Sequence, residues 1–299
     1  MQAKQDLQQF EIPNTLSIVK IKDGLTKIVI INTLAEAEIY LHGGHLTHFQ
    51  PKDEAPLIFD AKNSTITPSK SVHAGIPICW PWFGAHPTDA SKPQHGFARD
   101  FVWHIKESKV LNSKATEVIL TLQDSPQTRE LFAYAFELEL TFVIGTTLSV
   151  SLKTTNLDTQ AFSITQALHT YFSIGDIEAI EINGVENTPF IDYTDYKKEK
   201  SENESLEVRE EINRVYVPTE ATCYIADHKM HREIIIEKDG SHSTTIWNPW
   251  KSNTLHDLTN DKYRKFVCIE TTNALQDAKT LQPQEHHTIK QVISIKTPN

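Results

Sequence analysis

His169, in the stretch FSITQALHTYFSIGD, is the first residue whose type and setting suggest chemistry. Side chains of a strand alternate between two faces, so residue counting places His169 on a face of small and polar side chains. The other members of this face are Ser163, Thr165, Ala167 and Tyr171. An imidazole with a pKa of about 6.5 is suited to proton donation at neutral pH. The alternative interpretation is a surface or hydrogen-bonded structural histidine.

Glu270, in the stretch KFVCIETTNA, is the second candidate. The same counting places Phe266, Cys268 and Glu270 on one face, so the carboxyl group shares its surroundings with an aromatic ring and a thiol. Desolvation there should raise the pKa of Glu270 from about 4.3 toward the range useful to a general base. Because the strand begins beside Lys265, a paired surface carboxylate is the alternative interpretation.

Residues 73–100 are dense in Pro, Trp, Phe, Gly and His, which predicts a long ordered loop that walls a pocket. Within this loop, Arg99 and Gln94 of KPQHGFARD offer a guanidinium fork and an amide. These groups suit a hydroxylated or anionic ligand. Tryptophan rings are candidates either for packing against a sugar ring or for the core, and they are Trp80, Trp82, Trp247 and Trp250.

Histidines are most concentrated in the stretch His42-Gly-Gly-His45-Leu-Thr-His48. If the chain turns at the two glycines, the three rings need not converge, and no acidic or cysteine ligand follows at a characteristic spacing. We therefore expect no metal site. The sequence also lacks Gly-rich phosphate loops, G-x-S-x-G elbows and H-E-x-x-H helices, which are the usual signatures of nucleotide cofactors, serine hydrolases and zinc proteases.

Strands must position these candidates, because period-two alternation dominates the chain and helical stripes are hard to find. The best hairpin joins residues 137–144 to residues 148–153 through Gly145-Thr146-Thr147. Many strands and only 10 glycines predict an all-β fold of large packed sheets. The other predicted strands are residues 16–22, 27–32, 36–41, 116–123, 162–172, 233–238, 266–271 and 288–296.

Two segments depart from this strand pattern. Ser125 followed by Pro126 predicts a short helical turn with a serine cap. Residues 195–211 are dense in Lys and Glu and predict a solvated loop. No internal repeat or low-complexity tract is visible, so we expect residues 1–299 to form a single domain.

The net charge of the chain indicates which classes of binding partner are disfavoured. The 299 residues include 39 Asp and Glu against 29 Lys and Arg, a net charge of −10, which disfavours binding to nucleic acid and to acidic membranes. The longest uncharged apolar stretch, residues 74–85, is too short for a membrane helix. Charged residues near the start replace the apolar core of a signal peptide. We therefore expect a cytoplasmic protein, with Cys79, Cys223 and Cys268 buried and reduced.

Taken together, several stretches resemble the hexose-6-phosphate mutarotases, or YeaD-like glucose-6-phosphate 1-epimerases, of the galactose-mutarotase-like superfamily. The matching stretches run in family order and are GIPICWPWFGAHP, PQHGFARDFVW, ALHTYFSIGDI, EINGVENTPFID, TTIWNPW and YRKFVCIETTNA. The resemblance implies a large antiparallel β-sandwich, the galactose-mutarotase-like supersandwich, with a substrate cleft on its concave sheet face. It also implies that the protein needs no cofactor.

The resemblance assigns catalytic roles to two residues. Glu270 would be the general base that takes the proton of the anomeric hydroxyl, and His169 the general acid that protonates the ring oxygen. The ring would open to the aldehyde and close on the other face after rotation about the adjoining carbon bond. The implied activity interconverts the α and β anomers of a hexose 6-phosphate, with glucose 6-phosphate as the expected substrate.

Substrate-binding roles fall on Gln94, His95 and Arg99, with two departures from the family pattern. His73 stands where an Arg usually precedes the G-G-I-P motif, and Asn213 replaces the usual acidic substrate contact. A titratable group in place of a fixed cation weakens the hold on a phosphate. A mutarotase of an unphosphorylated hexose and a non-catalytic carbohydrate-binding protein are therefore alternatives. The expected partner is a small sugar phosphate, and the expected state a monomer or weak homodimer.

Overall fold

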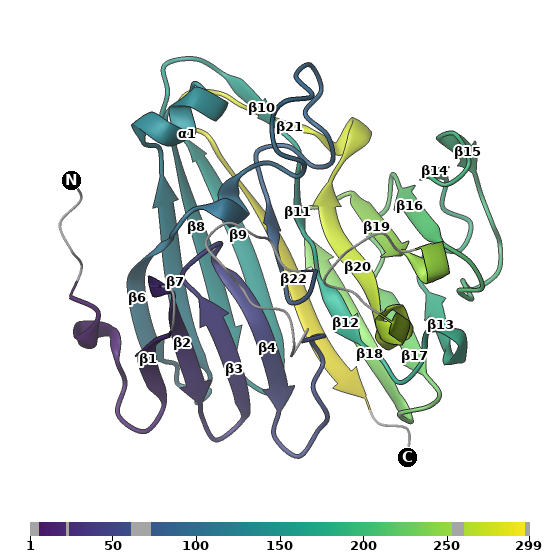
Figure 1. The fold of residues 1–299 in the computed structure, drawn as a ribbon, viewed down its shortest axis with the longest axis horizontal. Coiled ribbons are helices and arrows are strands. Elements are labelled where there is room, and N and C mark those ends of the chain that lie inside the picture. Colours follow the sequence, from purple (N-terminus) through teal and green to yellow (C-terminus); the bar gives the residue numbers. More distant parts are fainter. Residues whose placement is uncertain (1–5, 22–23, 61–72, 253–259, 297–299) are drawn as a thin grey trace.

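The computed structural model describes residues 6–21, 24–60, 73–252 and 260–296, and most of their regular secondary structure is antiparallel strand (Figure 1). The all-β prediction is confirmed. A four-stranded sheet of order β1-β2-β3-β4 comes first in the chain. Its strands are β1 (Leu16–Lys20), β2 (Thr26–Ile31), β3 (Ala35–Tyr40) and β4 (His45–Pro51).

The longest strands form an eight-stranded sheet, called here the β9 sheet, of order β13-β17-β18-β22-β9-β8-β7-β6. Its strands are β6 (His104–Val110), β7 (Thr116–Gln123), β8 (Phe136–Ile144), β9 (Leu148–Asn156), β13 (Ile180–Asn183), β17 (Cys223–Asp227), β18 (Arg232–Asp239) and β22 (His286–Lys296). The predicted hairpin is confirmed as β8 and β9, with Ile144 opposite Leu148 at the turn.

A second eight-stranded sheet, called here the β20 sheet, has the order β15-β14-β16-β19-β20-β11-β5, and β12 also pairs with β20. Its strands are β5 (Ile78–Cys79), β11 (Gln166–Leu168), β12 (Tyr171–Ser173), β14 (Phe190–Asp192), β15 (Lys198–Lys200), β16 (Ile212–Tyr216), β19 (Ser243–Asn248) and β20 (Phe266–Asn273). A separate pair consists of β10 (Phe162–Ile164) and β21 (Lys279–Leu281).

The sheets stack in two layers (Figure 1). The four-stranded sheet lies over β6–β9, and the β20 sheet lies over β22, β18 and β17. An isolated bridge between Leu46 and Ile76 links β4 to the segment before β5. Alternate residues of β8 and β9 are buried, and their apolar side chains form one hydrophobic cluster with those of the covering strands. Removing this apolar surface from water between the two layers stabilises a β-sandwich.

Helices in the described parts of the chain are short, and none has the length and apolar character that a membrane crossing needs. Ser125 caps the predicted helical turn, α1 (Pro126–Leu131), by accepting from the Thr128 N–H. The 3₁₀ helices are η1 (Gln8–Phe10), η3 (Ala98–Asp100), η4 (Ile177–Ala179), η5 (Trp250–Ser252), η6 (Asn260–Lys265) and η7 (Leu275–Asp277).

Three predictions about individual segments need correction. Residues 162–172 are divided among β10, β11 and β12 and do not form one strand, because β10 leaves the β20 sheet to pair with β21. Residues 195–211 include the edge strand β15 and two buried side chains, Leu206 and Val208, so this segment is only partly solvated. The predicted strand at residues 16–22 ends at Lys20, and Lys22 lies outside the described residues.

Candidate active site

Strand register brings His169 and Glu270 together. β11 and β12 pair with β20 in one continuous register, in which Leu168 lies opposite Thr271 and Tyr171 lies opposite Cys268. Continuing this register sets His169 opposite Glu270, and directly opposed residues of an antiparallel pair project from the same face. The ladder is interrupted there, because the Thr170 N–H donates to Leu168 O (3.0 Å) in a γ-turn centred on His169.

The two side chains are buried and in contact. His169 Nε2 lies 3.4 Å from Glu270 Oε1, and the residues are only 8% and 1% exposed. His169 Nδ1 and Glu270 Oε2 are buried without a hydrogen-bond partner, and so is Thr245 Oγ1 on the neighbouring strand, directly opposite Glu270. Buried polar atoms normally have partners, so this group of open donors and acceptors suits a polyhydroxylated ligand. Thr245 was not among the residues that sequence patterns singled out.

Burial shifts both pKa values toward the neutral forms. Desolvation raises the pKa of Glu270 well above its usual value, as the sequence predicted. Desolvation first, and then the nearby charges of His95, Arg99 and His73, lower the pKa of His169 well below 6.5. In the free pair, burial therefore favours a neutral carboxyl group on Glu270 and a neutral imidazole on His169.

Aromatic rings surround His169, so the prediction of a small, polar face is wrong. The imidazole stacks on Tyr171, with ring centroids 4.9 Å apart and an interplanar angle of 12°. Trp247 meets it edge-on at 6.1 Å. Of the expected face members, Ser163 lies on β10 and hydrogen-bonds to Thr280 of β21 instead. The expected face of Phe266, Cys268 and Glu270 fits the structure, since Phe266 and Cys268 pack with Tyr171 and Trp247 in a small apolar cluster.

The segment that ends in η3 brings His95 and Arg99 to this face. Gly96 adopts a φ of +72°, and a Cβ there would lie 2.0 Å from Trp80 O, so only glycine lets the loop pack this closely. His95 stands edge-on to His169 with centroids 5.6 Å apart, and its Nδ1 accepts from the Gly84 N–H (3.2 Å). Burial, followed by the charges of Arg99 and His73, lowers the pKa of His95 to about 3.

Arg99 is oriented by its own loop. Its Nη2 donates to Gln94 O (2.7 Å), while its Nε is buried without a partner. The positive charge of Arg99 contributes to lowering the pKa of both His169 and His95, which places a cation beside the pair. Gln94 is exposed at the rim and contacts Arg99 through its backbone carbonyl.

The two departures from the family pattern also lie around the pair. His73 acts electrostatically on both His169 and His95. Asn213 of β16 lies opposite Trp247 of β19, which lies opposite Cys268 of β20. Asn213 therefore projects from the same sheet face as Glu270, two strands away.

Other candidates from the sequence serve the core. Trp80 packs against Phe97 and Phe136, and Trp250 packs against Tyr263. Trp82 is buried and donates to Pro93 O, so only Trp247 of the four tryptophans contacts His169. The three cysteines are free and buried, as expected.

The histidine stretch at residues 42–48 has a structural explanation. His42 and His45 are buried, and His45 Nε2 hydrogen-bonds to Ala74 O (2.8 Å). No group of three or more His, Cys, Asp or Glu side chains among the described residues is arranged to hold a metal ion.

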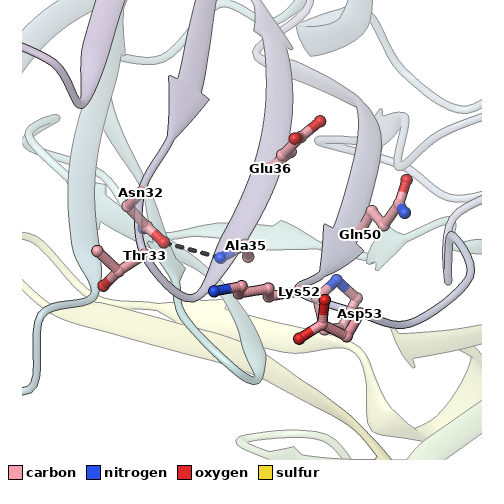
Figure 2. A pocket seen from close by; sticks show the side chains of 8 residues that line it. Asn32, Thr33, Ala35, Glu36, Gln50, Lys52 and Asp53 are labelled. Atoms are coloured by element: carbon pink, nitrogen blue, oxygen red, sulfur yellow. Dashed lines mark hydrogen bonds between the residues drawn. The ribbon is translucent and has the colours of Figure 1, made fainter.

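A hollow also opens at the turn between β2 and β3 (Figure 2). Asn32 caps this turn by accepting from the Ala35 N–H (2.8 Å), and Lys52 and Asp53 lie across the opening. The polar side chains here are partly or fully exposed, and none of the candidate site residues lines the hollow. The arrangement around His169 and Glu270 is therefore the better candidate site.

The β-sandwich fold and the buried contact between His169 and Glu270 suit a protein that does acid/base chemistry, and comparison with known proteins gives the family. The profile of the family described as "Aldose 1-epimerase" matches residues 26–294, so the chain belongs to that family. This confirms the resemblance seen in the sequence and the expected class of isomerase.

Relatives and solved structures agree with this assignment. Proteins named "Putative glucose-6-phosphate 1-epimerase" from Cenchrus ciliaris and Salmonella typhimurium are 30% and 32% identical to this chain. The matches cover 90% and 84% of this chain, and 84% of each relative. The crystal structure of a "putative mutarotase (YeaD)" from Salmonella typhimurium superposes with a TM-score of 0.88 at 28% identity, over 96% of both chains. A galactose mutarotase-like protein from Lactobacillus casei shares the fold, with a TM-score of 0.73 at 16% identity over 90% of this chain and all of its own.

Proposed function

We propose that this protein interconverts the α and β anomers of a hexose 6-phosphate, glucose 6-phosphate in particular, and that His169 and Glu270 move the protons. The observation that carries the proposal is the buried contact of 3.4 Å between an imidazole and a carboxyl group, each with one unpartnered polar atom. Opening a pyranose ring needs one group to remove a proton and another to supply one. The names of the relatives supply the substrate.

Ring opening moves two protons, one from the sugar to Glu270 and one from His169 to the sugar. Glu270 takes the proton of the anomeric hydroxyl while protonated His169 donates to the ring oxygen, so the bond between the anomeric carbon and the ring oxygen breaks and an aldehyde forms. His169 is then neutral and Glu270 protonated, which is the state that burial favours. Rotation about the adjoining carbon bond presents the other aldehyde face, and ring closure returns both protons.

The aromatic rings and the open hydroxyl suit the sugar itself. Tyr171 holds the imidazole plane by stacking, and Trp247 offers an apolar ring on the same face. Thr245 Oγ1, opposite Glu270, is free to bond a sugar hydroxyl. Fixed groups of this kind reduce the entropic cost of reaching a reactive geometry.

Arg99 is the permanent cation proposed to meet the phosphate, since a guanidinium pairs well with phosphate oxygens. His73, His95, Gln94 and Asn213 complete the proposed binding set. This proposal gives His73 the place that an arginine has in the resembling family.

Anomer exchange measured directly tests the proposal. Proton NMR exchange spectroscopy on equilibrated glucose 6-phosphate, glucose and galactose should show enzyme-dependent exchange that is fastest for glucose 6-phosphate. Arg99→Ala should raise KM for glucose 6-phosphate and change the rate on glucose little. Exchange no faster than in buffer for all three sugars, together with saturable sugar binding, would identify a binding protein. Faster exchange of the unphosphorylated sugars would identify an ordinary hexose mutarotase.

The wider setting is part of the same proposal. We propose one domain over residues 1–299, acting in the cytoplasm as a monomer or weak homodimer. The hydrophobic cluster that runs through both halves of the sandwich supports a single domain, and the three reduced cysteines suit the cytoplasm. Light scattering across a range of protein concentrations measures the oligomeric state, and a stable dimer at low concentration would contradict this part.

A further inference from the structure

Gln291 is a polar residue in an apolar row. It lies on β22 of the β9 sheet, between Val150 of β9 and Lys238 of β18, and its inward neighbours on β22 are Ile289 and Ile293. All three inward side chains are fully buried. Strand alternation would place an apolar side chain here, because burying an amide costs free energy unless every polar atom is bonded.

The amide of Gln291 is fully bonded, and every partner adjoins the candidate pair. Oε1 accepts from Thr170 Oγ1 (2.6 Å), and Nε2 donates to Thr271 Oγ1 (2.9 Å) and to Ile269 O (3.2 Å). The carbonyl of Ile269 can only accept, so it fixes which end of the amide carries the nitrogen. Thr170 follows His169 directly, and Ile269 and Thr271 flank Glu270.

These bonds cross the point where the strand ladder is interrupted. The register of β11 and β12 on β20 sets Thr170 opposite Ile269, and at this position the Thr170 N–H turns back to Leu168 O. Gln291 bonds to both members of this pair from beneath the sheet. One side chain of the β9 sheet therefore ties the two segments together behind His169 and Glu270.

From this geometry we propose that Gln291 is a positioning residue, which holds the His169 and Glu270 segments at the spacing that proton transfer needs. The proposal rests on the proposed function of the pair. Gln291 lies on the core side of the β20 sheet, so it acts through Thr170, Ile269 and Thr271 and does not touch the sugar. A misplacement of about 1 Å can lower a rate by about 10²-fold, so losing this brace should affect catalysis more than substrate binding.

Gln166→Met is the matched control for Gln291→Met. Gln166 is also fully buried, and it also joins the two sheets, since it accepts from Thr154 of β9 (3.4 Å) and donates to Asn273 of β20 (2.8 Å). Its bonds lie three residues further along the ladder from the pair. Both variants remove one buried amide that bonds to β20, so their losses of thermal stability should be similar.

The expected result separates the two variants by kcat. Gln291→Met should lower kcat for anomer exchange by about 10- to 100-fold with KM changed less than about threefold, and should shift the pH dependence of kcat. Gln166→Met should keep kcat within about twofold of the wild type. A wild-type kcat and pH profile in Gln291→Met would overturn the proposal. An equal loss in Gln166→Met would also overturn it, because loosening of the sheets in general would then explain both.

Thr170→Val provides the second measurement, and decides the question alone if Gln291→Met does not fold. It removes the hydroxyl that Gln291 accepts from and keeps the side-chain shape. Thr170→Val should lower kcat, and the double variant should lose no more than Gln291→Met alone, since coupled residues give non-additive effects. Additive losses of kcat in the double variant, or a wild-type kcat in Thr170→Val, would contradict the positioning role of Gln291.

A readout without turnover distinguishes this proposal from the proposed function. The NMR signals of the His169 ring should move in Gln291→Met and stay in place in Gln166→Met. If the wild type did not exchange anomers, the proposed function would be wrong. If the His169 signals did not move in Gln291→Met, the proposed positioning role of Gln291 would be wrong.

Discussion

Two central strands of this molecule, β8 and β20, bury their residues in opposite ways. Burial in β8 alternates strictly, so that Phe136, Leu138, Leu140, Phe142 and Ile144 face the core and the residues between them face outward. Every residue of β20 is buried, including the consecutive polar residues Glu270, Thr271, Thr272 and Asn273. A strand covered on both faces normally reads as a continuous apolar run. Burying the polar run of β20 therefore costs free energy, and the candidate site residue Glu270 belongs to this run.

One glutamate on each strand shows the difference. Glu139 of β8 lies on the solvent side, and its hydrogen bond to Lys106 (2.9 Å) is the main cause that lowers its pKa. Glu270 of β20 is 1% exposed, and burial raises its pKa. The same side chain is thus an ionised surface group in one half of the sandwich and a group favoured in its neutral form in the other. The half of the sandwich that contains β8, called here the scaffold half, leaves its charged side chains exposed to water. The half that contains β20, called here the site half, buries its carboxyl group away from water.

The largest effect should come from removing the buried carboxyl. Glu270→Gln should lower the rate of anomer exchange by about 10²–10⁴-fold, because the amide cannot take up a proton. The free energy of unfolding at pH 7 should stay the same or increase, since the folded state no longer has to accommodate a desolvated carboxyl. Exchange NMR and urea titration measure the two quantities.

Glu139→Gln is the matched control for that substitution. Its exposed ion pair is worth about 0–1 kcal/mol, and exchange should continue at the wild-type rate. If Glu270→Gln were as active as Glu139→Gln, the proposed role of Glu270 would be wrong.

The opposite pattern should follow from a cavity in the scaffold half. Phe142 of β8 is fully buried, and Phe142→Ala should lower the free energy of unfolding by about 3–5 kcal/mol. The folded fraction should keep its kcat within about twofold, because the cavity lies away from the pair. Denaturant titration gives the stability, and kcat per folded molecule gives the activity. A large fall in kcat at full folding would show that the two halves are not separable.

Acid should destabilise the protein through its buried histidines. Burial is the main cause that lowers the pKa of His45 to about 4 and that of His95 to about 3. Below an unfolded-state pKa of about 6.5 the unfolded chain binds protons that the folded chain refuses, so stability falls as pH falls. The slope should reach about 1.4 kcal/mol per pH unit for each histidine.

The pair itself should add little to this slope between pH 4.5 and 6.5, since the shifts of His169 and Glu270 have opposite signs. Urea titrations at pH 7.5, 6 and 5 measure how the free energy of unfolding depends on pH. His45→Gln should reduce the slope by the contribution of one histidine. Stability that is constant from pH 7.5 to 5 would contradict the expectation.

The smallest effect should come from a helix cap remote from the chemistry. Ser125→Ala removes the side chain that accepts from the Thr128 N–H at the start of α1. We expect a loss of about 1 kcal/mol in the free energy of unfolding and no change in exchange rate. Ser125→Asp, which can cap the same N–H, should restore most of the stability, and a rate loss in Ser125→Ala would contradict the separation of scaffold and site.

Local patterns were enough to predict several elements. The alternation in β8 and β9, the turn at residues 145–147 and the serine cap of α1 all follow from neighbouring residues. The placing of Glu270 beside Phe266 and Cys268 follows from strand period alone, and so does the direction of its pKa shift. The resemblance to known mutarotases added the expected fold and the pairing of Glu270 with His169.

Other features depend on contacts that no local pattern encodes. Residues 162–172 look like one strand in sequence, yet β10 leaves to pair with β21, and this removes Ser163 from the face of His169. Gln291 looks like an interruption of an apolar row until its partners on the other sheet are known. The unpartnered hydroxyl of Thr245 likewise has meaning only beside Glu270.

The sequence by itself determined the strand-rich scaffold, the turns and the residue types available for acid/base chemistry, because these depend on periodicity and on intrinsic side-chain properties. The tertiary structure decided which of those residues meet. Register across β11, β12 and β20 joins a histidine and a glutamate from separate parts of the chain, and burial shifts the pKa of each toward its neutral form. Pairing and desolvation arise only when distant segments pack, so they belong to the fold and not to any one stretch of residues.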